Sequence, residues 1–255
     1  INQLKGSVDA DIMQLKKKAA ALLKVNIEDM LSFQIIKQSI DARKKPELYY
    51  VYSCGVQIAR QEKVCKQAKN PNVILVNEKT YELPACGEEN LAHRPLVIGA
   101  GPAGLFAAYT LCLAGFRPIL IERGKSVEER TKDVEEFWRS GVLNTASNVQ
   151  FGEGGAGTFS DGKLNTVVKD PAKRNQFVLE TFVQFGAPCA ILYENKPHIG
   201  TDILSTVIRN LREYLLDHGT DIYFQTCAKD FEITDGRIRK VICEDMRGNP
   251  ITFDV

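Results

Sequence analysis

Hydrophobic residues recur at helical spacing near the start of the chain, at Ile12, Leu15, Ala19, Leu22 and Leu23. This spacing predicts a helix over residues 9–24, for which Ser7 or Asp9 can serve as the N-cap. Two later segments, residues 31–41 and 48–59, are rich in isoleucine, tyrosine and valine. Such β-branched and aromatic composition predicts a pair of strands.

Two shorter elements complete this first part of the chain, a helix predicted over residues 60–69 and a strand predicted over residues 73–76. Residues 1–83 are therefore expected to form a small α+β domain with the order α-β-β-α-β. Residues 84–94 contain Pro84 and Gly87 among mixed polar residues, which is typical of a linker.

A strand, a glycine-rich turn, a helix and a second strand are predicted after the linker. The apolar run Leu96 to Ile98 leads into Gly99-Ala100-Gly101-Pro102-Ala103-Gly104, and a second apolar run, Ile119 to Ile121, ends at Glu122. This order is typical of the βαβ unit that binds dinucleotides, and the flanking elements make the G-x-G-x-x-G match specific. We therefore predict an α/β fold with a Rossmann-like domain over residues 95–255.

The residue types in the glycine turn suit a pyrophosphate. Gly99 allows the tight turn out of the strand, Gly101 lets the backbone approach the ligand, and Gly104 lets the helix pack against the sheet. Pro102 and Ala103 belong to the first helical turn. Proline suits this position because an N–H there would have no partner within the helix, and proline has none. The remaining N–H groups and the positive end of the helix dipole then face the phosphates.

Glu122 stands 18 residues after Gly104, at the end of the second predicted strand. A carboxylate at this position accepts hydrogen bonds from ribose hydroxyls. It also disfavours a 2′-phosphate, so we expect an adenosine half without that phosphate.

The rest of the chain continues the α/β pattern. Helices are predicted over residues 126–139, 172–185 and 201–217, and strands over residues 222–226, 228–233, 238–243 and 251–255. The Asp235-Gly236 pair between two of these strands predicts a hairpin turn.

A second glycine cluster lies between residues 151 and 163. Its end, Gly157-Thr158-Phe159-Ser160-Asp161-Gly162-Lys163, nearly matches a nucleotide P-loop, but Leu164 replaces the hydroxyl residue that would bind Mg²⁺. We interpret the cluster as a second backbone cradle, whose free N–H groups point at a ligand. A surface loop is the alternative.

Composition and charge exclude several classes of protein. The 255 residues are 44% hydrophobic and 25% charged, with a net charge of +1, so we expect no nucleic-acid partner. The seven cysteines show no metal-ligand spacing, and the chain has no signal peptide or long apolar span. We therefore expect a cytoplasmic location, no membrane partner and no metal.

These motifs resemble those of the glutathione-reductase-like FAD flavoproteins, and most closely the group of uncharacterised FAD-dependent dehydrogenases, or FAD/NAD(P)-binding oxidoreductases. The resemblance rests on the strings VIGAGPAGLFAAYTLCLAGFRPILIERG, NVQFGEGGAGTFSDGKL and KPHIGTD, and on SIDARKK before a tyrosine-rich strand. It implies that Gly99, Gly101 and Gly104 hold the FAD pyrophosphate and that Glu122 binds the adenosine ribose. It also implies further contacts from Arg123, Gly154, Gly155, Ala156, Gly157, Ser160, Asp161 and Ala228.

The resemblance implies an FAD-dependent oxidoreductase that accepts a hydride from a donor such as NAD(P)H and passes it on. Two alternatives stay open: a dehydrogenase that binds NAD(P) directly in the βαβ unit, and a flavoprotein with a non-redox role in RNA or protein modification. No side chain stands out as catalytic, and the substrate and oligomeric state are not indicated. Flavoproteins of this kind close the FAD site with later segments that do not occur by Val255. We therefore expect the chain to be part of a longer protein and to be inactive alone.

Overall fold

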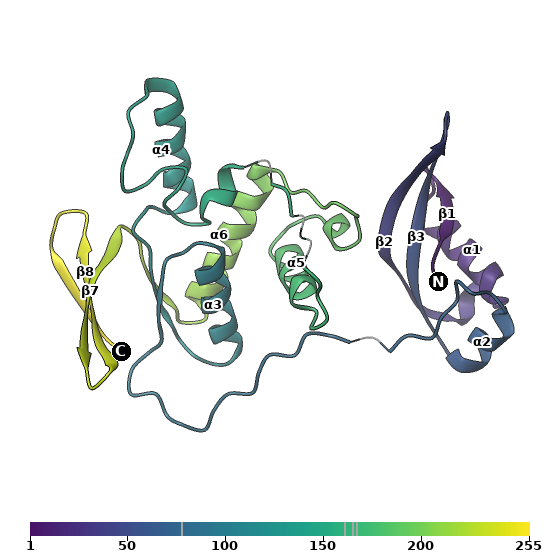
Figure 1. Cartoon of the computed structure of the whole chain (residues 1–255), viewed down its shortest axis with the longest axis horizontal. Coiled ribbons are helices and arrows are strands. Elements are labelled where there is room, and N and C mark those ends of the chain that lie inside the picture. Colours follow the sequence, from purple (N-terminus) through teal and green to yellow (C-terminus); the bar gives the residue numbers. More distant parts are fainter. Residues whose placement is uncertain (78, 161, 165, 167) are drawn as a thin grey trace. The chain divides into compact units, whose positions relative to one another are not determined.

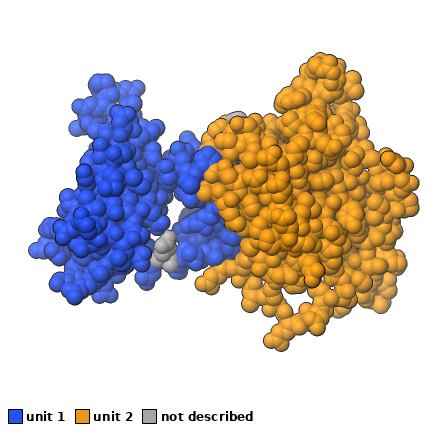
Figure 2. Space-filling view, turned by 180° about the vertical axis from the view of Figure 1, so that it is seen from behind, with its two compact units in different colours: residues 1–81, 164–180, 188–197 blue, residues 82–163, 181–187, 198–255 orange. Residues whose placement is uncertain are grey.

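The computed structural model describes residues 1–77, 79–160, 162–164, 166 and 168–255. These residues form two compact units, coloured separately in Figure 2. Unit 1 contains residues 1–81, 164–180 and 188–197, and unit 2 contains residues 82–163, 181–187 and 198–255. The domain boundaries expected from the sequence, 1–83, 84–94 and 95–255, stay a prediction.

Unit 1 is built around a three-stranded antiparallel sheet in the order β1-β3-β2. Its elements are β1 (Leu4–Ser7), α1 (Ile12–Leu23), a 3₁₀ turn (Ile27–Asp29), β2 (Met30–Lys44), β3 (Glu47–Ile58) and α2 (Gln61–Ala68). The apolar stripe of α1 packs on the sheet, where Leu15, Ala19 and Leu23 join Tyr52 and Cys54 in the core. The predicted helix–strand–strand–helix order is confirmed.

The third strand of this sheet is not the one predicted. Residues 73–76 form no strand, and Ile74, Leu75 and Val76 are all exposed. The open edge of β3 is instead occupied by β1, with Leu4 opposite Tyr52. Leu4 and Gly6 of β1 are buried while the residues between and after them are exposed, so this short strand carries the alternation that a half-buried edge requires.

The other edge of the sheet has a partner from far along the chain. The Gln38 N–H of β2 donates to the Tyr193 carbonyl at 2.7 Å, and the Asn195 N–H donates back to the Gln38 carbonyl at 3.1 Å. This pairing covers the middle of a long edge strand, where unpaired backbone groups would otherwise be available to other chains.

Unit 2 contains a parallel sheet in the order β4-β5-β6 and an antiparallel sheet in the order β7-β8-β9. The parallel strands are β4 (Leu96–Ile98), β5 (Ile119–Ile121) and β6 (Asp221–Tyr223), and the antiparallel ones are β7 (Thr226–Thr234), β8 (Arg237–Asp245) and β9 (Pro250–Asp254). Helix α3 (Pro102–Leu113) lies beside α6 (Thr201–Asp217), and α4 (Val127–Ser140) also contacts α6 (Figure 1). Helix α5 (Arg174–Gln184) contributes residues to both units, and two 3₁₀ turns cover Ala156–Phe159 and Cys189–Leu192.

The predicted βαβ unit, the three predicted helices and the hairpin at Asp235-Gly236 are confirmed. The single strand predicted over residues 222–226 is wrong, because β6 ends at Tyr223 and β7 begins at Thr226. Gln225 between them has φ +55°, a left-handed conformation that breaks an extended strand, and its N–H donates to the Gly124 carbonyl at 2.9 Å. The break lets the chain leave the parallel sheet and enter the antiparallel one.

A helix that crosses a lipid bilayer needs about 20 consecutive, mostly apolar residues. Among the described residues, no helix combines the length and the apolar character needed to cross a membrane.

Candidate functional site

The turn between β4 and α3 has the geometry of an anion site. Gly99 has φ +96°, and its N–H donates to the Ile121 carbonyl of β5 at 2.7 Å. Gly101 is the N-cap of α3 and Pro102 is the first helical residue. A Cβ at Gly101 would meet nothing within 4 Å, so open space lies in front of the helix N-terminus. This space lies beside the N-cap of α3, the end of a helix at which the first N–H groups have no partner within the helix.

Gly104 has a different task in the same turn. A Cβ on Gly104 would lie 1.8 Å from the carbonyl oxygen of Gly99, which is closer than any real contact. The packing predicted at Gly104 is therefore tightest against the turn backbone of Gly99, and the Val97 side chain of β4 would lie 3.5 Å from the same Cβ.

Glu122 lies at the end of β5 with only 6% of its surface exposed. One carboxylate oxygen accepts a hydrogen bond from the Ala100 N–H at 2.8 Å, and the other accepts one from the Gly124 N–H at 2.8 Å. The carboxylate thus fixes the glycine turn to the segment that follows β5. Each oxygen keeps a lone pair for a further donor, and the ribose contact stays a prediction.

A loop over residues 148–155, called the loop wall below, faces the glycine turn. The Gly154 N–H donates to the Ala100 carbonyl at 2.8 Å. A Cβ on Gly155 would lie 2.8 Å from Pro102, and one on Gly124 would lie 2.5 Å from the Gly152 backbone. The first half of the second glycine cluster therefore packs against the glycine turn. The N–H groups of Glu153, Gly154 and Gly155 all donate to carbonyl oxygens of the chain, so the free N–H groups predicted for a cradle are not found at these three positions.

The glycine turn, the end of β5, the start of β7 and the loop wall line an open cavity of about 380 Å³. Six of the residues predicted for the site line it: Gly99, Gly101, Glu122, Arg123, Gly155 and Ala228. This volume falls within the usual range of ligand sites.

Other predicted residues stand outside the cavity lining. Pro102, Ala103, Gly104, Gly154, Ala156, Gly157 and Ser160 do not line it. Ala156 and Gly157 lie in a 3₁₀ turn, and the Ser160 hydroxyl donates to the Gly157 carbonyl at 2.8 Å. Asp161 lies outside the described residues.

Seven lining residues were not predicted from the sequence: Ile98, Ile121, Gln150, Phe151, Gly152, Thr226 and Cys227. Ile98 and Ile121 are the last residues of their strands, so the rule that ligands bind at the carboxyl ends of parallel strands would have indicated them. The Arg123 guanidinium stacks over the Phe151 ring at 3.9 Å, a contact between segments that the sequence alone does not bring together.

The loop wall is held from behind by Arg130 of α4, which is completely buried. Its guanidinium donates at 2.6–3.3 Å to five carbonyl oxygens, those of Asn148, Val149, Gly152, Glu153 and Gly155. The Cζ atom of the Arg130 guanidinium also lies 4.8 Å from the centre of the Phe159 ring. Burial lowers the pKa of Arg130 to about 10, which leaves it charged at neutral pH.

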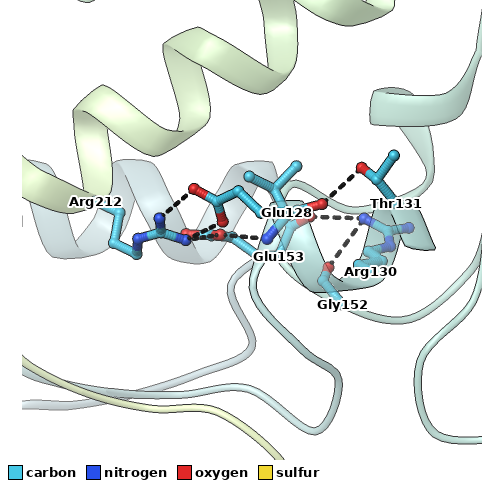
Figure 3. A network of polar contacts seen from close by, with 7 residues as sticks. Glu128, Arg130, Thr131, Gly152, Glu153 and Arg212 are labelled. Atoms are coloured by element: carbon cyan, nitrogen blue, oxygen red, sulfur yellow. Dashed lines mark hydrogen bonds and ion pairs between the residues drawn. The ribbon is translucent and has the colours of Figure 1, made fainter. Parts of the chain in front are cut away.

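Glu153 of the loop wall belongs to a neighbouring ion-pair network, shown in Figure 3. One of its oxygens accepts from the Val127 N–H at 2.8 Å and from Arg212 of α6 at 2.6 Å, while the other has no hydrogen-bond partner among the residues that the structure describes. Arg212 also pairs with both oxygens of Glu128, at 2.6 and 3.0 Å. Burial raises the pKa of Glu153 to about 7, and the Arg212 charge opposes that rise.

Two families match parts of the chain. Residues 97–137 match the NAD(P)-binding Rossmann-like domain. Residues 1–57 match a domain of unknown function, DUF8436. The first match confirms the Rossmann-like dinucleotide-binding domain that was predicted from the sequence, within a mixed α/β chain.

An uncharacterised protein of Clostridium beijerinckii is 41% identical over 254 residues. The match covers all of this chain and 47% of that protein, so the chain spans about half the length of this curated relative.

Several solved structures resemble about two thirds of the chain at low identity. THI4 of Thermovibrio ammonificans has a TM-score of 0.41 at 13% identity, covering 64% of this chain and 54% of that one. The 3-ketosteroid-Δ4-(5α)-dehydrogenase of Rhodococcus jostii RHA1 has a TM-score of 0.42 at 13% identity. The match covers 64% of this chain and 44% of the dehydrogenase. A flavoprotein/dehydrogenase of Cytophaga hutchinsonii has a TM-score of 0.35 at 14% identity. The match covers 63% of this chain and 37% of that protein. These scores are too low to transfer a function to this chain.

Proposed function

We propose that this chain carries the FAD-binding part of an oxidoreductase. The observation that carries the proposal is the cavity in which the open face of Gly101, the N-terminus of α3 and the carboxylate of Glu122 converge. A helix N-terminus with free N–H groups suits a pyrophosphate, and a carboxylate at the next strand end suits a ribose.

The loop wall favours FAD over a nicotinamide dinucleotide bound in the same place. It adds a second backbone surface, Gly152 to Gly155, opposite the first glycine turn. A long flavin dinucleotide needs such additional backbone beyond the βαβ turn. The alternative is an NAD(P)-dependent dehydrogenase, which the description of the family matched by residues 97–137 favours.

In this proposal each lining group has a defined task toward FAD. Gly99, Gly101 and the N-terminus of α3 bind the pyrophosphate, while Glu122 and Arg123 bind the adenosine half. Ala228, at the start of β7, contacts the adenine. The bound flavin supplies hydride acceptance, and the protein supplies binding and orientation. NAD(P)H is the proposed hydride donor.

Titration of the purified protein with FAD, NAD⁺ and NADP⁺ tests the proposal. We expect FAD to bind more tightly than either nicotinamide dinucleotide. Gly101→Val should abolish FAD binding without unfolding the protein, because Gly101 has φ −74° and its side-chain direction is empty. Gly87→Val is the matched control, since Gly87 also has open space around it and lies away from the cavity lining. Tighter binding of NAD⁺ than of FAD would favour the alternative, and unchanged FAD binding by Gly101→Val would refute the proposed site.

A further inference from the structure

Arg130 is a buried cation that lacks a carboxylate partner. Its side chain is fully buried, and its five hydrogen bonds all go to backbone carbonyls. Within the described part of the chain, no carboxylate forms an ion pair with it. Carbonyl dipoles satisfy the donors of a guanidinium, but they do not cancel its full charge, and buried charges are normally paired.

Most charged groups around Arg130 already have hydrogen-bond or ion-pair partners other than Arg130. Glu153 and Glu122 both act on the Arg130 charge through space. Glu153, however, is in contact with Arg212, which Glu128 also binds, and Glu122 is held by two backbone N–H groups. Lys125 on the same segment is paired with Asp133 at 2.8 Å. Among the described residues, Arg130 and Glu122 are therefore the two buried charges of this cluster that are held by backbone dipoles and not by a side chain of opposite charge.

The carbonyls that Arg130 holds belong to the loop wall, which lines the cavity with Gln150, Phe151, Gly152 and Gly155. The contact with Gly152 is close, because a Cβ there would lie 2.4 Å from the Arg130 side chain. Gly152 is itself a lining residue, so the Arg130 side chain lies next to the backbone that forms this part of the cavity wall. An anionic group in the cavity would thus lie next to the Gly101 N-cap of α3 and against the loop wall that Arg130 holds.

We propose that Arg130 is a positioning residue of the dinucleotide site: it holds the loop wall in its binding shape and provides the buried positive charge that a pyrophosphate faces. This inference rests on the proposed function. It concerns a residue that does not touch the ligand and acts through the carbonyl groups that it binds.

The test compares adenosine with ADP, because the two ligands share the adenosine half and differ in phosphate charge. Calorimetric titrations would measure both affinities for wild type, Arg130→Gln and Arg130→Lys. We expect Arg130→Gln to lower the preference for ADP over adenosine about tenfold, since a charge acting at short range in a protein is worth at least that factor. Arg130→Lys keeps the charge and should keep the preference within about threefold while binding both ligands more weakly.

A purely structural role predicts a different result. Loss of folded protein lowers both affinities by the same factor, so the ratio of the two is independent of stability. Arg139→Gln is the matched control, because Arg139 lies on the same helix but is exposed and paired with Glu136. A second readout needs no ligand: amide hydrogen exchange at Gly154 and Gly155 should accelerate about tenfold in Arg130→Gln.

The outcomes separate the two proposals. Equal weakening of adenosine and ADP by Arg130→Gln would overturn the inference about Arg130 and leave the proposed function standing. Failure of the wild-type protein to bind adenosine, ADP or FAD would refute the proposed function, and the inference with it.

Discussion

Replacing Gly104 by alanine should destabilise unit 2, although alanine is the better helix former. Gly104 lies within α3, where the exchange by itself would stabilise the helix by about 1 kcal/mol. The new Cβ, however, would lie 1.8 Å from the Gly99 carbonyl oxygen. A backbone atom in a tight turn cannot rotate away as a side chain does, so either the turn or the whole helix must shift.

The magnitude follows from weighing these two effects. Overpacking of a well-packed region costs about 1–3 kcal/mol and occasionally more. This contact is severe and falls on backbone, so the upper end applies. After the gain in helix propensity, the net loss should be about 2 kcal/mol.

Guanidinium unfolding followed by tryptophan fluorescence would measure this loss. The chain has one tryptophan, Trp138 in α4, so the signal reports on unit 2. Gly101→Ala is the control, since it makes the same chemical change three residues away where a Cβ meets nothing within 4 Å. If the two variants unfold at the same denaturant concentration, the close contact between Gly104 and Gly99 is not present and the reasoning fails.

Two further predictions concern carboxylates of the site. Glu122→Ala should weaken FAD binding by about 1–3 kcal/mol and lower stability by a similar amount, because the buried N–H groups of Ala100 and Gly124 lose their acceptor; calorimetry with unchanged FAD affinity would contradict the ribose assignment. Glu153 has a pKa of about 7, raised by burial from an ordinary value of 4.5. Its contribution to stability is thus fully present below about pH 4.5 and is lost as pH rises through about 7. Unfolding measured between about pH 5 and pH 8 should therefore show wild type losing up to roughly 3 kcal/mol relative to Glu153→Gln, and parallel pH profiles would rule this out.

The first glycine turn could be predicted because its signals are local. The two apolar runs, the glycine spacing and the acid at the strand end all lie within about 30 residues, and the structure places Gly99, Gly101 and Glu122 on one cavity. The role of Gly104 was predicted as close packing, and the structure adds that the partner is the Gly99 backbone.

The rest of the site depends on contacts between distant segments. Phe151 lines the cavity because it stacks with Arg123, and Thr226 and Cys227 line it because Gln225 breaks the chain between two sheets. Neither the stacking nor the break has a periodic signal. The same holds for unit 1, where Leu4 to Ser7 occupies the edge of β3 that was assigned to residues 73–76. Both segments are short. Residues 73–76 are entirely apolar, whereas Leu4 to Ser7 contains lysine, glycine and serine, so composition favoured the segment that does not pair.

The pairing of Gln38 with residues near Glu194 has a consequence for the order in which the protein is made. All three strands of the unit 1 sheet have been synthesised long before Tyr193 and Asn195 are translated. At ordinary rates of synthesis the wait lasts on the order of ten seconds. Throughout that interval the backbone of β2 around Gln38 has no partner from its own chain, and a second nascent copy or a chaperone has time to bind it. During synthesis, the backbone of β2 around Gln38 is therefore the part of the unit 1 sheet that stays open to pairing with another chain.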